Sequence, residues 1–198
     1  MAILPIMRLG HPALRTPAKP VSPEQLAEPE MQTLIDDMLE TMMDAGGVGL
    51  AAPQVGLPWQ LFVYAAVDGP RKPSTEEPEQ DGDHTEPEGP ELKVLVNPGL
   101  EPESRETVYD WEGCLSIPDL RGLVPRYPVI AVHALDRHGE RVSFQAERYE
   151  ARIIQHEFDH LNGMIFLDRM RDLRSLSYRE EWLEYMTEDP DDEGAAEA

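Results

Sequence analysis

The stretch RYEARIIQHEFDHLNG, residues 148–163, predicts a helix closed by Asn162-Gly163, because glycine readily adopts the left-handed conformation that ends helices. Inside it, His156, Glu157 and His160 form the pattern HExxH. Positions 156 and 160 project from one face of a helix about one turn apart, so both imidazoles can reach one metal ion. Glu157 can then reach a water molecule beside that ion. The alternative is a pair of surface histidines on an amphipathic helix.

A catalytic metal ion needs a third protein ligand and an open fourth position. In the pattern HExxHxxGxxH the third ligand is a histidine, but Phe166 occupies that position and cannot bind a metal ion. In gluzincins a downstream helix supplies a glutamate, and Glu180, Glu181 and Glu184 lie in roughly the right region. These glutamates are one alternative for the third ligand.

Cys114 is the other alternative, within the sequence WEGCLS at 111–116. A thiolate is a strong ligand for borderline and soft metal ions, and the glycine before it allows a close backbone approach. We therefore favour Cys114 over the glutamates. An isolated cysteine can also be a small buried hydrophobic residue without chemistry.

A third segment, GVGLAAPQ at residues 47–54, follows the first predicted helix and is rich in small residues. Small residues allow a backbone to approach another chain or a ligand closely. The segment ends in Gln54, whose neutral side-chain amide can donate a hydrogen bond to a developing oxyanion. It lacks the preceding strand and the GxGxxG spacing of a dinucleotide-binding site, and a packed turn is the alternative.

The composition narrows the class of protein and its partners. The 198 residues suit one domain, and the formal net charge of −22 argues against DNA or an anionic membrane as a partner. No apolar run reaches the roughly 18 residues of a membrane span. One cysteine excludes an intrachain disulfide, so we expect a reducing compartment, the cytoplasm.

The acidic residues concentrate in two segments. Residues 69–91 hold eight acidic residues and five prolines, and residues 187–198 hold six acidic residues and no basic one. Neither segment has the apolar side chains that offset the entropy of folding. We therefore expect a single catalytic domain at 1–186 with a flexible acidic insert at 69–91, followed by a disordered acidic tail. An acidic docking surface is the alternative.

Apolar residues at helical spacing predict a first helix between Ser22 and Met43, stopped by Gly46-Gly47. Ser22, Pro23 and Gln25 fit a capping box with proline at the first helical position. The apolar stripe of this helix consists of Met31, Leu34, Ile35, Met38, Leu39 and Met42.

Apolar runs predict four strands, at residues 60–66, 92–96, 128–135 and 140–146, the last two joined by a turn at DRHG. Further helices are predicted from about Arg148 to Leu161 and from Leu173 to Met186. Strands followed by helices, without βαβ alternation, indicate an α+β fold with mainly antiparallel sheets. We expect these sheets to pack around the central helix that carries HExxH, with one helix N-terminal and one C-terminal to it.

The segments GVGLAAPQ, EGCLS and QHEFDH resemble, in order and spacing, the three signature motifs of peptide deformylases. The similarity extends to Arg8–Arg15, to VNP at 96–98 and to IPDLRGLVPR at 117–126, and so covers most of the chain outside the acidic segments. ARIIQHE is similar to the subgroup that includes mitochondrial and plant organellar members. The resemblance implies a metal-dependent hydrolase that removes the formyl group from the N-terminal formylmethionine of new polypeptides and releases formate.

The resemblance also implies roles for individual residues. Glu157 is general base toward water and then general acid toward the leaving amine, a role worth roughly 10²–10⁴-fold in rate. Gln54 and the backbone N–H of Leu115 stabilise the oxyanion. The implied metal ligands are Cys114, His156 and His160.

Substrate binding is expected at two places. By the resemblance, Val48 and Gly49 bind the substrate backbone in extended form, as one strand adds to another, and Gly113 completes this set. Tyr149, Arg152 or Ile153, and His156 lie on one side of the predicted helix, so the turns before the implied metal ligands should line the pocket for the methionine side chain. Tyr149, Arg152 and Ile153 are therefore the candidate pocket residues.

The charge of Arg152 is unexpected in an apolar pocket. We predict that its aliphatic stem packs there while its guanidinium turns outward. By the family pattern, Glu112 and Arg126 form a buried pair that braces the cysteine loop, and an ordinary surface ion pair is the alternative.

The donor set does not determine the metal, and the resemblance implies ferrous iron, with zinc, nickel or cobalt as alternatives. The expected partners are formylated N-termini of nascent polypeptides, with transient association with the ribosome and no DNA or membrane. The acidic C-terminal end argues against contact between the tail and ribosomal RNA.

Two other hypotheses compete with this one. A zinc hydrolase that uses a downstream glutamate would leave Cys114 and Gln54 unexplained. A structural metal site, or a degenerate homologue that only binds peptide N-termini, is disfavoured because structural sites normally close with four protein ligands.

Overall fold

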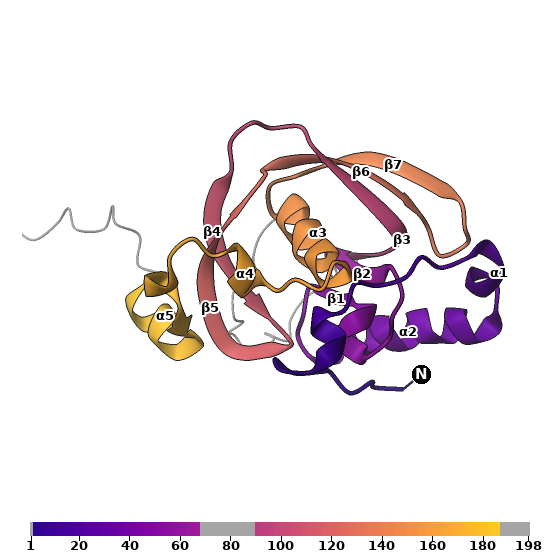
Figure 1. Cartoon of the computed structure of the whole chain (residues 1–198), viewed down its shortest axis with the longest axis horizontal. Helices are drawn as coiled ribbons and strands as arrows, with labels where there is room; N and C mark the ends of the chain where they lie inside the picture. The colour runs from indigo at the N-terminus through magenta and orange to yellow at the C-terminus, as the bar shows by residue number, and fades with distance from the viewer. Residues whose placement is uncertain (1, 68–89, 187–198) are drawn as a thin grey trace, which may run out of the picture.

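Two antiparallel sheets surround one helix, α3 (Arg148–Leu161), in the computed structural model, which describes residues 2–67 and 90–186 (Figure 1). The bounds of α3 are those that the sequence predicts, and Gly163 after it has φ +71°. The arrangement confirms the predicted α+β class, with antiparallel sheets around the helix that carries HExxH.

The larger sheet has the strand order β1-β2-β3-β6-β7, and every neighbouring pair is antiparallel. The four predicted strands are all present in it, and Gly139, at φ +83°, closes the predicted turn between the last two. β1 has only three residues, too few for an alternation of apolar and polar residues to be recognised in the sequence. The strands are β1 (Gly49–Ala51), β2 (Leu61–Ala66), β3 (Glu91–Pro102), β6 (Val129–Leu135) and β7 (Arg141–Glu147).

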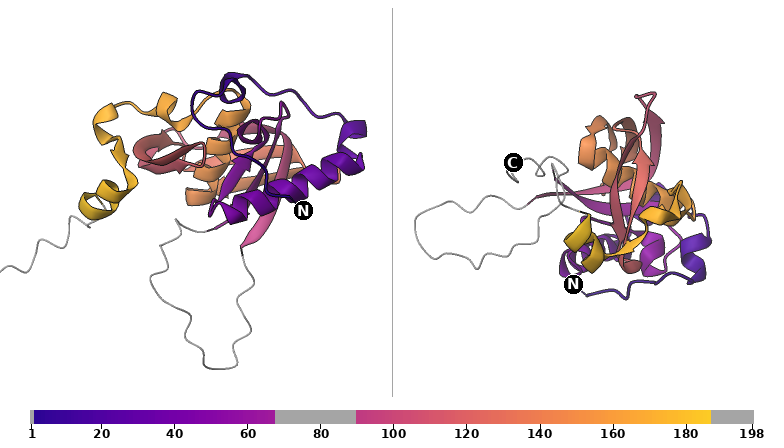
Figure 2. Two further views of the ribbon diagram at one scale, coloured as in Figure 1. Left: turned by 90° about the horizontal axis from the view of Figure 1, so that it is seen from below. Right: turned by 90° about the vertical axis from the view of Figure 1, so that its left-hand side faces the viewer.

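Strand β2 is buried on both faces, which explains its continuous apolar sequence. Phe62 and Tyr64 join the hydrophobic cluster that contains α3, whereas Leu61, Val63 and Ala65 join the cluster that contains α2 (Pro29–Asp44). The larger sheet therefore lies between α3 and α2, as Figure 2 shows.

The predicted N-terminal helix is divided in two, α1 (Pro23–Leu26) and α2 (Pro29–Asp44). Pro29 has no N–H to continue the hydrogen bonds of α1, so it begins a new helix instead. The predicted capping box of Ser22 and Gln25 is present at the start of α1. On α2 the fully buried part of the predicted stripe is Met31, Ile35, Met38 and Met42.

The smaller sheet has the order β4-β5-β8, with β4 (Val108–Cys114), β5 (Ile117–Arg126) and β8 (Ser177–Tyr178). The apolar pattern does not predict β4 or β5, because their prolines, glycines and charged residues interrupt it. Leu115 and Ser116 form the turn between the two strands, and the register shifts between Glu112 and Cys114. Cys114 therefore lies at the end of β4, immediately before a tight turn.

The predicted helix from Leu173 to Met186 is wrong in its first half. A 3₁₀ turn, η3 (Leu173–Ser175), is followed by β8, and only then by α5 (Arg179–Tyr185). The Asp172 side chain accepts a hydrogen bond from the Arg174 N–H, which favours a turn over a helix there. Three further short elements are η1 (Pro12–Arg15), η2 (Ala52–Val55) and α4 (Phe166–Arg169).

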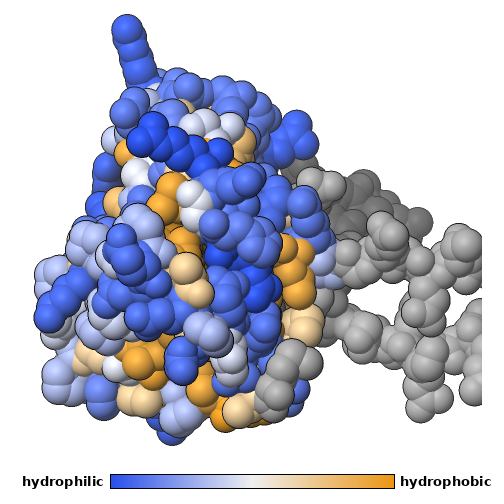
Figure 3. All heavy atoms as spheres, turned by 90° about the vertical axis from the view of Figure 1, so that its right-hand side faces the viewer, coloured by the Kyte–Doolittle hydropathy of each residue, from blue (hydrophilic) through white to orange (hydrophobic). Residues whose placement is uncertain are grey.

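The surface is mainly polar on the side drawn in Figure 3, where hydrophobic residues gather only in small separate groups. In residues 2–67 and 90–186, no helix combines the length and the apolar character needed to cross a bilayer. The predicted acidic tail at 187–198, and the predicted insert at 69–91 up to residue 89, lie outside the described residues. Glu91, the last residue of the predicted insert, begins β3 and is paired with Ala66 of β2.

Candidate metal centre

The end of β4 and the C-terminal half of α3 bring three possible metal ligands together. The ligand atoms of Cys114, His156 and His160 all lie within 4.8 Å of one another, and all three residues are buried. Cys114 Sγ lies 3.2 Å from His160 Nε2, and the centroids of the two imidazole rings are 5.1 Å apart. The helical spacing of the histidines and the position of the cysteine before a tight turn together produce this cluster.

These donors suit a divalent transition-metal ion, because one sulfur and two imidazole nitrogens match borderline and soft metals. His156 Nδ1 lies 2.9 Å from Glu112 Oε2, which leaves the Nε2 of that ring for an ion. Within the described part of the chain, the cluster includes none of the glutamates considered above, and Glu180, Glu181 and Glu184 are exposed on α5.

Glu112 is the carboxylate that orients His156, and it is itself held by arginine. Arg126 donates to both of its oxygens, Nε to Oε1 at 2.9 Å and Nη2 to Oε2 at 3.0 Å. Both side chains are buried, so the predicted Glu112–Arg126 pair is confirmed and the surface alternative is wrong. Burial acts to raise the pKa of Glu112, but the charge of Arg126 and the hydrogen bonds outweigh it and hold that pKa well below its usual range.

Asp159, inside the HExxH stretch, extends this charge network on its other side. Arg126 Nη1 donates to Asp159 Oδ2, and Arg169 Nη2 donates to Asp159 Oδ1 at 2.6 Å. Asp159 is 2 % exposed, whereas Arg169 reaches the surface. The motif itself does not single out this residue, because its second variable position accepts any residue type. A charged residue on the buried face of a helix was the available signal.

The predicted outward turn of the Arg152 guanidinium is wrong. Its side chain is only 7 % exposed, and its Nη1 donates to Glu112 Oε1 at 2.8 Å and to the carbonyl of Val124 at 2.9 Å. Its Nη2 donates to the carbonyl of Val108 at 2.8 Å. Both Nη groups of the guanidinium find acceptors inside the protein, in Glu112 and in carbonyls of β4 and β5, so exposure is unnecessary. Arg152 thus joins the strand that carries Cys114 to the helix that carries the histidines.

Replacing Arg152 with methionine should lower the free energy of unfolding by about 3 kcal/mol, because Glu112 and two strand carbonyls lose a buried charged partner. For a chain of this size that corresponds to a fall of roughly 6–12 °C in the thermal midpoint, measured by calorimetry. Arg148→Met is the matched control, since Arg148 is exposed on the same helix. Equal midpoints for the two variants would contradict the network.

Glu157 lies beside the histidine pair and has no partner for one oxygen. Its side chain is buried, and its Oε2 makes no hydrogen bond in residues 2–67 and 90–186. Burial raises the pKa of Glu157 to about 7, and the charge of His156 acts against that rise. A carboxyl group in this condition can both accept and return a proton near neutral pH.

The pKa values of the two histidines are shifted in opposite directions in the metal-free chain. Burial acts to lower the pKa of His156, but hydrogen bonds with Cys114 and Glu112 raise it well above its usual value. Burial and the charge of His156 together hold the pKa of His160 well below its usual value. Both rings must be neutral to bind a metal ion, so ion binding releases a proton from His156.

The predicted small-residue segment lies directly against this centre. A Cβ at Gly49 would be 2.8 Å from the carboxyl carbon of Glu157, and a Cβ at Gly47 would be 2.7 Å from Leu115 Cδ1. A side chain at either position would force Glu157 or Leu115 to move. The structure thus brings all three predicted motifs together.

Gln54 directs its amide nitrogen toward the cysteine. Its Oε1 accepts from the Ala51 N–H at 2.7 Å, which fixes the amide orientation. Its Nε2 then lies 3.5 Å from Cys114 Sγ and 3.3 Å from Ser116 Oγ. The side-chain amide is therefore a fixed donor beside the three possible metal ligands.

The predicted substrate residues lie in different surroundings. Gly49 begins β1, which is the edge strand of the larger sheet, and the carbonyl of Val48 accepts from the Ala65 N–H at 2.9 Å. Gly113 precedes Cys114 on β4. Ile153 is buried against the larger sheet, on a different side of α3 from Arg152.

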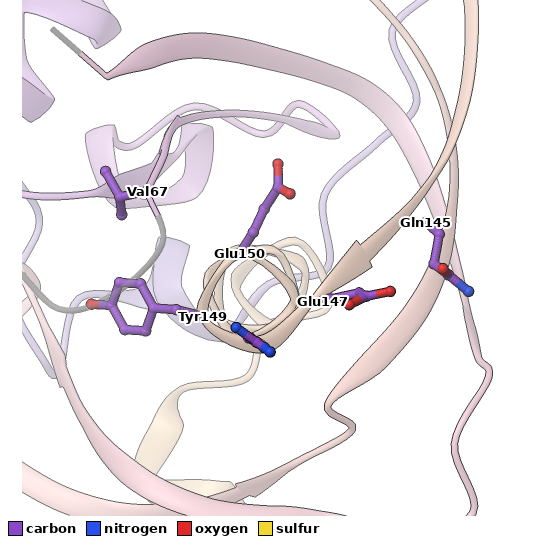
Figure 4. A pocket seen from close by; sticks show the side chains of 6 residues that line it. Val67, Gln145, Glu147, Tyr149 and Glu150 are labelled. Carbon is purple, nitrogen blue, oxygen red and sulfur yellow. The ribbon is translucent and has the colours of Figure 1, made fainter. Parts of the chain in front are cut away.

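Tyr149 lines a hollow of about 290 Å³ at the beginning of α3. Figure 4 shows the tyrosine projecting from the helix on the same side as Val67, while Glu147 and Gln145 lie on the other side. Arg152 and Ile153 are not among the residues that line this hollow, so the structure does not gather the three predicted pocket residues around it. The lining residues are Val67, Gln145, Glu147, Arg148, Tyr149 and Glu150.

Comparison with known proteins gives a consistent result. A family model described as polypeptide deformylase matches residues 3–175. Peptide deformylase 1 of Bordetella pertussis is 44% identical over 175 residues, which cover 88% of this chain and 92% of the relative. Peptide deformylase 2 of Nostoc sp. is 40% identical over 185 residues, 93% of this chain and 96% of the relative.

Solved structures resemble the chain over nearly their whole length. The crystal structure of peptide deformylase from Thermotoga maritima has a TM-score of 0.72 at 34% identity and covers 87% of this chain and 100% of that one. A class I type b peptide deformylase from Acinetobacter baumannii with Met-Ala-Ser bound has a TM-score of 0.73 at 37% identity, and covers 85% of this chain and 99% of that one.

Proposed function

The chain belongs to the polypeptide deformylase family of metal-dependent hydrolases, which remove the N-formyl group from the N-terminal methionine of nascent polypeptides. It is such an enzyme, and we propose that it holds its metal ion with Cys114, His156 and His160. The convergence of these ligand atoms within 4.8 Å, beside a buried glutamate, is the observation that carries the proposal. A bound divalent ion supplies Lewis-acid activation of water and of the formyl carbonyl at this place.

Glu157 is the proposed proton carrier. It accepts a proton from water as the water oxygen attacks the formyl carbon, and it returns this proton to the nitrogen as the C–N bond breaks. Formate and a free N-terminal amine are the products. Its buried carboxyl group, with a pKa raised by burial to about 7, supports both directions of transfer near neutral pH.

Gln54 Nε2 and the backbone N–H of Leu115 are the proposed donors to the oxyanion that forms on the formyl oxygen. The support for Gln54 is its fixed orientation, since Ala51 holds its oxygen and leaves its nitrogen beside Cys114. Leu115 follows Cys114 in the turn between β4 and β5, so its N–H is within the same loop. Donors fixed before the reaction need no reorganisation when the charge develops.

Gln54→Ala should lower kcat by about 10²-fold with a smaller effect on KM, because an oxyanion donor acts mainly in the transition state. Gln54→Glu should also lower kcat, since it keeps an acceptor for the Ala51 N–H but has no amide donor. Steady-state formate release with each variant measures both constants. A Gln54→Glu enzyme with wild-type kcat would contradict the donor role.

The substrate backbone is proposed to lie as an added strand along β1, with Val48 and Gly49 as its partners. The position of β1 at the edge of its sheet supports this, because an edge strand has unpaired N–H and C=O groups. Gly113, at the end of the other sheet, is the proposed contact on the opposite side. Tyr149 and Arg152 are proposed to border the methionine side chain, Arg152 through its buried stem and not through an exposed charge. Ile153 faces the larger sheet on a different side of α3, so it is left out of this proposed pocket.

Three further assignments complete the proposal. Ferrous iron is the proposed native metal, with zinc, nickel or cobalt able to occupy the same donor set. The cytoplasm is the proposed location, with transient association with the ribosome, because formylated N-termini first emerge there. Residues 1–186 are proposed to act as one catalytic domain.

Formate release from formyl-Met-Ala-Ser tests the proposal directly. The protein is purified without oxygen, its metal content is measured, and formate is assayed before and after removal of the metal by a chelator. We expect about one ion per chain, and formate release that disappears with the metal and returns with Fe(II). A metal-loaded protein that releases no formate would contradict the proposed function.

A further inference from the structure

Trp182 of α5 packs against two of the three strands of the smaller sheet, β4 and β5. Its ring centroid lies 6.0 Å from that of Trp111 on β4, at an interplanar angle of 56°. The guanidinium carbon of Arg121, on β5, lies 5.8 Å from the centre of the Trp182 ring. Figure 1 shows α5 beside β5, on the side away from α3. One aromatic residue thus holds an arginine in place through a cation–π contact.

The Arg121 side chain crosses from β5 over Gly113 of β4. A Cβ at Gly113 would lie 2.9 Å from Arg121 Nε and still nearer to the rest of the guanidinium, so only glycine permits this position. Arg121 Nη1 donates to the carbonyl of Leu120 at 2.8 Å. In the part of the chain that the structure describes, this is its one hydrogen-bond acceptor, so most of its five N–H donors remain available.

The available donors lie near the edges of both sheets. β4 is one of the two edge strands of the smaller sheet, as β1 is of the larger one. The two edges approach each other where Leu115, after β4, packs against Gly47, before β1. A peptide added to β1 would run beside Leu115 and then Gly113, where its backbone carbonyls would meet the guanidinium that lies over that glycine.

We propose that Trp182 is a positioning residue for recognition of the nascent chain: it holds Arg121 where the guanidinium binds a backbone carbonyl of the second or third residue. The inference rests on the proposed function, because that function places the peptide beside Gly113. The ligand class is a peptide longer than one residue, recognised through its backbone and therefore independently of its sequence. Trp182 lies outside residues 3–175 that the family model matches, so this role is not carried over from the family pattern.

The test compares substrates of different length. For Trp182→Ala we expect KM for formyl-Met-Ala-Ser to rise about fivefold with kcat unchanged, and both constants for formyl-Met amide to stay at wild-type values. Arg121→Met should raise KM for the tripeptide by about tenfold, since it removes a charged donor outright. Trp182→Phe should restore most of the affinity, because a phenyl ring can still carry the guanidinium.

Tyr185→Ala is the matched control, since it removes an aromatic ring that is 68% exposed on the same helix. Calorimetric binding of the product Met-Ala-Ser, compared with methionine amide, provides a second readout that does not require turnover. The inference is overturned if Trp182→Ala affects both substrate lengths equally, lowers kcat alone, or behaves like Tyr185→Ala in both assays. Failure of the proposed function is distinct, because the wild-type protein itself would then release no formate.

Discussion

Replacing Glu157 with glutamine leaves the metal content unchanged and lowers kcat for formate release by about 10³-fold. The amide has nearly the shape of the carboxyl group, so it fits the space against Gly49, but it cannot accept a proton from water. KM should change little, because the residue acts on the proton and not on the peptide. Metal analysis and steady-state formate release with formyl-Met-Ala-Ser measure the two quantities.

Two comparisons make this result specific. Glu157→Asp keeps a carboxylate on a side chain that is one methylene group shorter, and should retain more activity than the glutamine variant. Glu140→Gln, which removes an exposed carboxylate in the turn between β6 and β7, should match the wild type. A glutamine variant within tenfold of wild-type kcat would exclude Glu157 as the proton carrier. Loss of metal in that variant would instead place the carboxylate among the ligands.

Replacing Cys114 with alanine should abolish both stoichiometric metal binding and formate release. Two imidazoles remain, and loss of the single thiolate ligand should weaken affinity by more than about 10²-fold, the upper range found for residues that only support a ligand. Titration of the metal-free protein with Co(II), followed by its visible spectrum, reports the affinity and the loss of sulfur ligation together.

The fold of the Cys114→Ala variant should survive, since the residue is small and lies at the end of a strand. Equal thermal midpoints for the metal-free variant and the metal-free wild type check this. If the variant binds one equivalent of Co(II) with wild-type affinity, the cysteine is not a ligand. The third ligand must then be sought elsewhere.

The helices and the larger sheet were predictable because their signals are local. Helix α3 has the predicted bounds, and the turn between β6 and β7 contains the glycine that its sequence indicates. The helix at 22–43 was predicted as one piece because its apolar stripe is continuous. The stripe depends on side chains alone, whereas Pro29 interrupts the backbone hydrogen bonds and so divides the helix.

The smaller sheet was not predictable in the same way. β4 and β5 contain residues that do not favour strands, and their pairing depends on partners distant in sequence. β8 exists only because Ser177 and Tyr178 pair with Arg121 and Leu120. A local pattern contains no information about such pairing, so the last predicted helix began several residues too early.

In the candidate site, too, residues with a local sequence signal were predictable and contacts between distant segments were not. His156 and His160 follow from helical spacing, and Cys114 follows from the chemistry of a thiol beside small residues. The position of the Arg152 guanidinium does not follow, because its acceptors are on two strands that the sequence did not reveal. A buried arginine is a rare event that general tendencies argue against, so the prediction of an exposed charge was wrong.

The antiparallel pairing of Ala66 with Glu91 has a practical consequence. Because the ends of β2 and β3 already lie opposite each other, a designed hairpin of about two residues, such as Asn-Gly, could join them. Lengthening a connection between fixed ends costs only about 0.6 kcal/mol for each doubling, so this junction should also tolerate a grafted reporter or affinity tag. It is therefore a natural attachment point for a label on the enzyme.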